Sequence, residues 1–157
     1  MEDNIVERLQ EITKKIRKTS GKIKLISLLD RAKQEYEQSK FNDCVSTCKK
    51  ALKANPNNAI ALRGLGCAMQ SMGNVKKAVE YYQKALESSE NKEIEYTLLG
   101  TLYYQEDNLE KAIEYYNLAI DANDNYDPAY EGRNQSMLEN HLKIIDLQDS
   151  LIQRNLF

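Results

Sequence analysis

The sequence is short of the residues that interrupt helices and of those that build catalytic or metal sites. Its 157 residues include only two prolines, six glycines and one histidine, and tryptophan is absent. So few turn-forming residues exclude a β-sandwich, and 41% hydrophobic with 29% charged residues excludes a disordered chain. No apolar run approaches the roughly 20 residues that a membrane span requires. We therefore expect an all-α chain, long enough for one domain with its own core.

The cysteine content and the amino-terminal residues bear on the cellular compartment. Three cysteines, an odd number, do not suit a disulfide framework. The first ten residues, MEDNIVERLQ, are acidic where a secretory signal is basic and then apolar. The sequence predicts reduced thiols and a cytoplasmic protein.

No group of residues has the composition of an active site. The single histidine, His141, lies on a mostly apolar stripe, and there is no glycine-rich phosphate loop or GxSxG motif. Cys44 and Cys48 are four residues apart but have no second ligand pair to complete a four-coordinate metal site, so we interpret them as core thiols. The sequence thus predicts no enzyme activity, no cofactor and no metal.

Charge is distributed unevenly along the chain. The net charge is +3 over residues 1–25, +4 over residues 26–92 and −9 over residues 93–157. The lysines and arginines of residues 14–24 have no aromatic residue among them, and a solvated helix face is their simplest interpretation. An anionic contact is the alternative for these residues, but for the chain as a whole we expect no binding of nucleic acid.

A pattern of residue size recurs every 34 residues. Three copies, 25–58, 59–92 and 93–126, align without a gap. The same three positions of each copy hold small or slender side chains: Ala32, Cys44 and Ala51, then Gly66, Ala78 and Ala85, then Gly100, Ala112 and Ala119.

Each copy contains two amphipathic stretches of about fourteen residues separated by a polar turn. The turns are Ser39-Lys40, Gly73-Asn74 and Asp107-Asn108. This predicts three antiparallel helical hairpins. Helices that approach closely need small residues where they cross, so we expect Gly100 to face Ala112.

The second and third copies resemble tetratricopeptide repeats. The resemblance rests on the repeat length, the Leu65-Gly66 and Leu99-Gly100 pairs, the Tyr103-Tyr104 pair and the spacing from Ala112 to Ala119. The first copy is more divergent, since Arg31-Ala32 replaces the Leu-Gly pair, although Pro56 falls where the family closes a unit. The resemblance covers about 100 residues and implies an α-solenoid of three hairpins, in which each hairpin buries the apolar face of its neighbour.

Two flanking segments complete the predicted organisation. Residues 1–24 comprise an amphipathic helix, with an apolar stripe of Ile5, Leu9, Ile12 and Ile16 that stops at Ser20-Gly21, and a short linker. We expect one of three arrangements for this helix. It folds back as a cap on the first repeat, it pairs with its copy in a homodimer, or it occupies the groove in which the repeats would bind a partner peptide. Residues 127–157 lack the turn and the core alanine of a fourth repeat, which predicts one long capping helix.

The resemblance also implies a concave groove lined by the first helix of each repeat, where related proteins bind peptide segments. The lining predicted from the register is mixed, with more apolar and small groups than charged ones: Leu29, Lys33, Tyr36, Ile60, Arg63, Cys67, Gln70, Ile94, Thr97, Leu98, Thr101, Tyr104, Glu131 and Gln135.

These observations predict a non-enzymatic scaffold that binds a peptide segment of a partner protein. One subtype of the family grips the carboxylate tail of chaperones with five Lys, Arg and Asn side chains, but the matching positions here are Leu29, Lys33, Gly64, Ile94 and Leu98, so we expect no such clamp. A second hypothesis is a dedicated chaperone for a hydrophobic export cargo, because the size, the flanking helices and the stretch GLGCAMQSMG resemble type III secretion chaperones.

Overall fold

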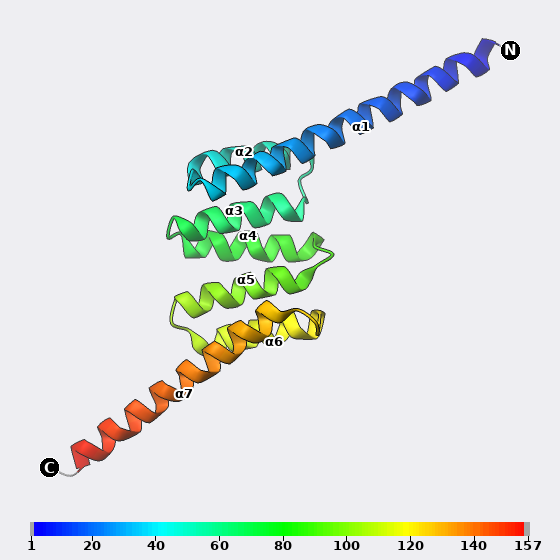
Figure 1. Cartoon of the computed structure of the whole chain (residues 1–157). Coiled ribbons are helices and arrows are strands. Elements are labelled where there is room, and N and C mark those ends of the chain that lie inside the picture. The colour runs from blue at the N-terminus through cyan, green and yellow to red at the C-terminus, as the bar shows by residue number, and fades with distance from the viewer. Residues whose placement is uncertain (1, 156–157) are drawn as a thin grey trace. The chain divides into compact units, whose positions relative to one another are not determined.

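The structure is a computed structural model that describes residues 2–155, with side chains described for Arg8 and for residues 10–154. Every secondary-structure element in residues 2–155 is a helix (Figure 1). The helices are α1 (Glu2–Glu37), α2 (Phe41–Ala54), α3 (Ala59–Ser71), α4 (Val75–Ser88), α5 (Lys92–Gln105), α6 (Leu109–Ala122) and α7 (Asp127–Asn155). The predicted all-α class is confirmed. No described helix combines the length and the apolar character of a membrane span.

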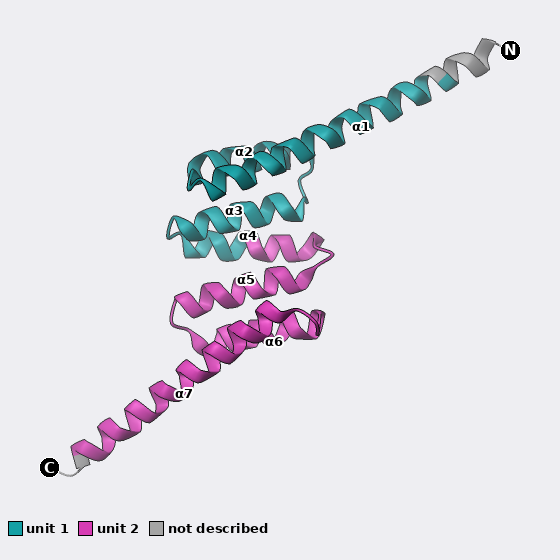
Figure 2. Cartoon of the chain, viewed as in Figure 1, with its two compact units in different colours: residues 1–81 teal, residues 82–157 magenta. Residues whose placement is uncertain are grey.

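The chain divides into two compact units, residues 1–81 and residues 82–157 (Figure 2). In unit 1, α2 packs against both α1 and α3. The core of unit 1 holds Ala32, Cys44, Cys48, Leu65 and Ala68, with half-buried Phe41, Val45, Leu52 and Tyr81 around it. In unit 2, α5 and α6 form a hairpin, and α7 packs mainly on α6.

The turns of the three predicted hairpins share one backbone conformation. Ser39, Gly73 and Asp107 have φ values of 59°, 75° and 61°, in the left-handed region, and they lie 34 residues apart. After each of them the next residue's N–H donates to a carbonyl five residues back, as in the bond from Asn74 to Met69 of 2.8 Å. This is the Schellman ending of a helix, so the predicted turn positions are confirmed.

The amino-terminal helix does not end at Ser20-Gly21, and that prediction is wrong. α1 runs without a break from Glu2 to Glu37, and Gly21 does not have the positive φ of a helix-ending glycine. A glycine inside a helix costs roughly 1 kcal/mol relative to alanine, and the lysine, arginine and isoleucine residues around it are tolerated well in helices. Without a proline, that cost is too small to stop the helix.

The continuity of α1 changes what its apolar stripe can do. The side chains of Ile5 and Leu9 lie outside the described residues, whereas Ile12 and Ile16 are exposed. A helix that continues straight into the first hairpin cannot turn back on its own chain. The fold-back cap and the occupied groove are therefore excluded, and the homodimer stays a prediction.

The predicted long carboxyl-terminal helix is confirmed. α7 has 29 residues, and Pro128 is its second residue, where its missing N–H is not needed. Ala129 and Ser136, two turns apart, are fully buried and attach the first half of α7 to its unit.

Candidate functional site

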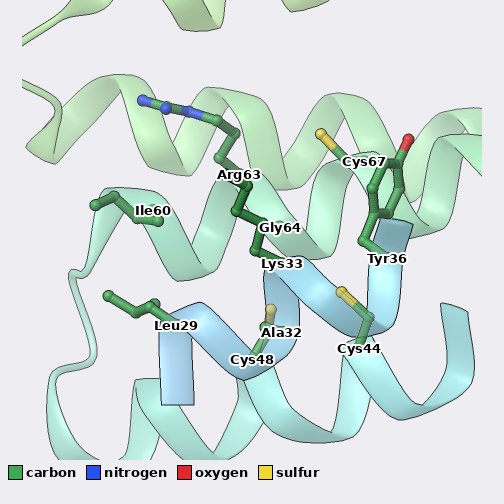
Figure 3. A pocket seen from close by; sticks show the side chains of 10 residues that line it. All are labelled: Leu29, Ala32, Lys33, Tyr36, Cys44, Cys48, Ile60, Arg63, Gly64 and Cys67. Carbon is green, nitrogen blue, oxygen red and sulfur yellow. The ribbon is translucent and has the colours of Figure 1, made fainter. Parts of the chain in front are cut away.

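A candidate binding site is a cavity of about 200 Å³ in unit 1 (Figure 3). It lies where α1, α2 and α3 meet, and its walls are almost entirely apolar. The lining residues are Leu29, Ala32, Lys33, Tyr36, Cys44, Cys48, Ile60, Arg63, Gly64 and Cys67. Six of these belong to the predicted groove; Gln70, the seventh predicted residue in this unit, does not line the cavity.

Gly64 sets the distance between α2 and α3 at the floor of the cavity. A Cβ atom at this position would lie 2.8 Å from Sγ of Cys48, closer than real Cβ contacts come. Because Gly64 has no side chain, α3 can approach α2 closely while the Cys48 side chain remains fully buried.

The thiols form part of the apolar wall. Cys44 and Cys48 are buried, as expected for core thiols, and Cys67 is half-buried. Burial raises the pKa of both the Cys44 and the Cys48 thiol. These two side chains are neutral at physiological pH, and neutral thiols behave as small hydrophobic groups. Within the described residues no three His, Cys, Asp or Glu side chains are placed to hold a metal ion.

The rim of the cavity is polar and carries positive charge. Tyr36 stands at one side, where its hydroxyl shares a 3.1 Å hydrogen bond with Oγ of Ser71. Lys33 is exposed and its Nζ lies 3.8 Å from Oε1 of Glu37, and Arg63 of α3 also lines the cavity. An exposed ion pair at this distance contributes little free energy, so Lys33 is available to a ligand.

A buried carboxylate anchors α1 beside this site. Glu35 is 8% exposed, and its Oε1 accepts a 2.7 Å bond from Nε of Arg31. Burial by itself raises the pKa of Glu35, but hydrogen bonds from Thr47 and Arg31 and the nearby positive charges outweigh that effect, so the pKa lies below its usual value. Glu35 therefore stays ionised and ties α1 to α2.

Two predicted groove residues of unit 2, Tyr104 and Gln135, form a hydrogen-bonded set with Glu139. The hydroxyl of Tyr104 donates to Oε2 of Glu139 at 2.6 Å and accepts from Nε2 of Gln135 at 3.0 Å, so both partners come from α7. The hydrogen bond to Glu139 raises the pKa of Tyr104. The sequence placed Tyr104 on an open face, and this contact with α7 could not be seen in the repeat register.

Most of the remaining predicted residues of unit 2 are half-buried on α5. The hydroxyl of Thr101 donates to the carbonyl of Thr97 at 3.0 Å and lies 3.1 Å from the hydroxyl of Tyr116. Ile94 and Leu98 are half-buried on α5, while Glu131 is exposed on α7. Sequence reasoning missed four lining residues of the unit 1 cavity, since it assigned the alanine and the two cysteines to the core alone; they are Ala32, Cys44, Cys48 and Gly64.

Comparison with known proteins agrees with the geometry of the hairpins. Tetratricopeptide-repeat models match residues 59–92 and residues 96–126, and the first copy lies outside both matches. No curated protein sequence matches the chain.

Solved structures with the same fold are numerous. The first tetratricopeptide domain of Spaghetti (RPAP3), bound to an HSP90 peptide, is 16% identical with a TM-score of 0.66, over 75% of this chain and 94% of that one. The Sgt2 domain from Aspergillus fumigatus is 19% identical with a TM-score of 0.68, over 74% and 79%. The Yersinia enterocolitica type III secretion chaperone SycD, in complex with a peptide of the translocator YopD, is 17% identical with a TM-score of 0.65, over 74% and 94%.

At such low identity these likenesses concern the fold, and they agree with the predicted α-solenoid class. Together with the two matched repeats and the three hairpin turns that recur every 34 residues, they identify the architecture. The chain thus contains two tetratricopeptide repeats, at residues 59–92 and 96–126, within an α-solenoid fold.

Proposed function

We propose that this protein is a non-enzymatic scaffold that binds a peptide segment of a partner protein, with the cavity of unit 1 as an anchoring site. The observation that carries the proposal is the cavity itself, an apolar pocket whose lining includes six of the positions predicted for binding. The predicted binding positions of unit 2, on α5 and α7, stay predictions beside this site.

The size of the cavity favours one amino-acid side chain over a cofactor. Pockets that hold small-molecule ligands measure about 300–1,000 Å³, and this cavity has about 200 Å³. Its apolar wall suits an aliphatic or methionine side chain. Lys33 and Arg63 at the rim favour a segment with an acidic residue beside that anchor.

The identity of residue 48 explains why unit 1 has this space. Residues 48, 82 and 116 hold the same place in the three repeats, as Cys48, Tyr82 and Tyr116. In unit 2 the ring of Tyr116 lies against Gly132 of α7, and in unit 1 the smaller Cys48 lies against Gly64 of α3. A thiol in the place of a phenol ring leaves room that a ligand side chain can fill.

A peptide display screen with the full chain tests the proposal. We expect selected peptides to carry an apolar anchor, and Cys67→Phe, which places a ring at the lining of the cavity, to weaken their binding at least tenfold. Cys67→Ser is the matched control, since it keeps the size of the side chain and should leave affinity within about twofold. Peptides that bind wild type and Cys67→Phe equally would show that the cavity is not the binding site.

The second hypothesis, a dedicated secretion chaperone, is supported by the likeness to SycD in its complex with a translocator peptide. The same fold is shared with the HSP90-peptide-binding domain of RPAP3, so this likeness does not select between partners. Affinity capture from the native host followed by mass spectrometry distinguishes them. A secretion chaperone is expected to retain one hydrophobic exported protein in stoichiometric amounts, and a general scaffold several proteins of one assembly.

The absence of enzyme activity and of a carboxylate clamp belongs to the same proposal. This part of the proposal rests on the residue types at the predicted groove positions. Among the groove positions on the first helix of each repeat, only Lys33 and Arg63 are cationic. We also place the protein in the cytoplasm, where thiols such as Cys44 and Cys48 stay reduced.

A further inference from the structure

From Met137 onward, α7 carries an apolar face that unit 2 does not cover. Met137, Ile144 and Leu151 recur every seven residues, and Leu138, Ile145 and Ile152 follow them one position later with the same spacing. These six side chains are 44–63% exposed. We call them the α7 face.

The α7 face lies on the side of the helix opposite to the contacts that hold α7 in place. Ser136 is buried, and Lys143 pairs with Asp107 at the α5–α6 turn. At 100° per residue, the middle of the α7 face lies about half a turn from these two residues. Within unit 2, α7 also extends beyond α6, so the last six residues whose side chains are described are all exposed (Figure 2).

The spacing and the area of the α7 face fit a second helix. An apolar stripe that repeats every seven residues stays on one side of a helix and can lie along a second helix. It is not a strict coiled-coil seam, because its apolar positions are adjacent pairs instead of alternating three and four residues apart. Six large side chains that are about half exposed present on the order of 500 Å² of apolar surface, which lies within the range of the largest patches on monomeric proteins. With Leu142, also exposed beside them, the face offers roughly 600 Å², so two such faces would bury about 1,200 Å² in total, the lower end of the range for specific interfaces.

We propose that the α7 face binds the α7 face of a second copy of this chain. Charge permits this occupant, because residues 137–154 carry three acids and two bases and so present almost no net charge to an identical segment. Hydrophobic pairing of two such helices is not opposed by repulsion. A near-neutral segment also gains no attraction from an anionic lipid surface.

The exposed apolar stripe of α1 lies on a segment that is strongly charged, unlike the segment that carries the α7 face. Ile12, Ile16, Ile23 and Ile26 are exposed there, but residues 8–26 carry seven bases against one acid. Two copies of that segment side by side would repel each other. Of the two long helices, α7 is therefore the one that self-association uses.

Light scattering of the full chain over a range of concentrations tests this pairing. We expect twice the monomer mass for the wild type and a monomer for Ile145→Glu, with dimerisation weakened at least tenfold. Ser150→Glu adds the same charge on the opposite side of α7 and should remain a dimer, as should Ile16→Glu on the α1 stripe. Circular dichroism should show unchanged helix content in all three variants, because each altered residue is exposed.

Three results would overturn the pairing. They are a wild-type monomer at every concentration, a dimer that survives Ile145→Glu, and a dimer that only Ile16→Glu dissociates. Salt gives a second readout, because an apolar seam keeps or gains strength as salt increases. A dimer that dissociates in salt would instead arise from contact between basic and acidic segments, which also contradicts the proposal.

Discussion

The ring of Tyr116 occupies the space that a side chain at Gly132 would need. A Cβ atom on Gly132 would lie 2.3 Å from Cζ of Tyr116, and one on Gly100 would lie 2.9 Å from Cδ1 of the same ring. Tyr116 is 3% exposed, so α5 and α7 both meet this side chain of α6 at glycines. The sequence predicted that Gly100 faces Ala112, but the three atoms nearest to its Cβ position all belong to Tyr116.

This contact predicts that Gly132→Ala destabilises the protein. The added methyl group must displace a buried aromatic ring, and overpacking of this kind costs about 1–3 kcal/mol of unfolding free energy. Urea unfolding followed by circular dichroism measures the loss. In the double variant Gly132→Ala with Tyr116→Leu, the two costs should be clearly less than additive; additive costs would mean that the ring and the methyl group do not meet.

Gly21→Ala should have the opposite effect. Gly21 lies inside α1, and a Cβ atom there meets no heavy atom within 4 Å. Alanine at a helical position without steric conflict increases stability by about 0.5–1 kcal/mol. Helix content should rise in circular dichroism at elevated temperature. A decrease would indicate that the helix does end near this residue.

The hairpin turns predict opposite effects at two equivalent positions. Ser39 has a φ of 59°, a conformation that glycine adopts more easily, so Ser39→Gly should stabilise by about 0.5–1 kcal/mol. Gly73 has a φ of 75° and open space around it, so Gly73→Ala should cost about 1 kcal/mol through the backbone alone. Thermal melts of both variants test this: the melting temperature should rise in Ser39→Gly and fall in Gly73→Ala, relative to wild type. Changes in the same direction in both variants would contradict the shared turn conformation.

Acid should weaken the attachment of α1 through Glu35. The pKa of this carboxyl is lower in the folded chain than its ordinary value of 4.5, so the folded state holds its proton less tightly than the unfolded state. The stabilisation is present above the ordinary pKa and is lost as the pH falls through the lower folded value. Unfolding measured from pH 6 downwards should therefore depend less on pH in Glu35→Gln than in wild type. Glu37→Gln, which removes an exposed carboxyl two residues away, is the control and should follow the wild-type curve.

Patterns along the chain were enough to predict the repeats, the hairpin turns and the long carboxyl-terminal helix. Each of these depends on residues close in sequence: a left-handed residue closes a helix at Ser39, Gly73 and Asp107, and Pro128 suits the first turn of the next one. The same local patterns misjudged Gly21, because one weak helix former does not outweigh the favourable residues on both sides.

Residues far apart in sequence decided the rest. The cavity of unit 1 depends on the thiol of Cys48 lying against Gly64, which has no side chain. The volume of the cavity is the space that the packed side chains leave unfilled, and a repeat pattern in the sequence does not predict that space. The hydroxyl of Tyr104 is engaged by Glu139, 35 residues away on α7, although the repeat register placed the ring on an open face. Apart from the end of the first helix, sequence alone determined which helices form and where they turn, since these are local choices of the backbone. Only the tertiary structure decided which surfaces are filled and which stay open, since that depends on the sizes of side chains brought together by packing.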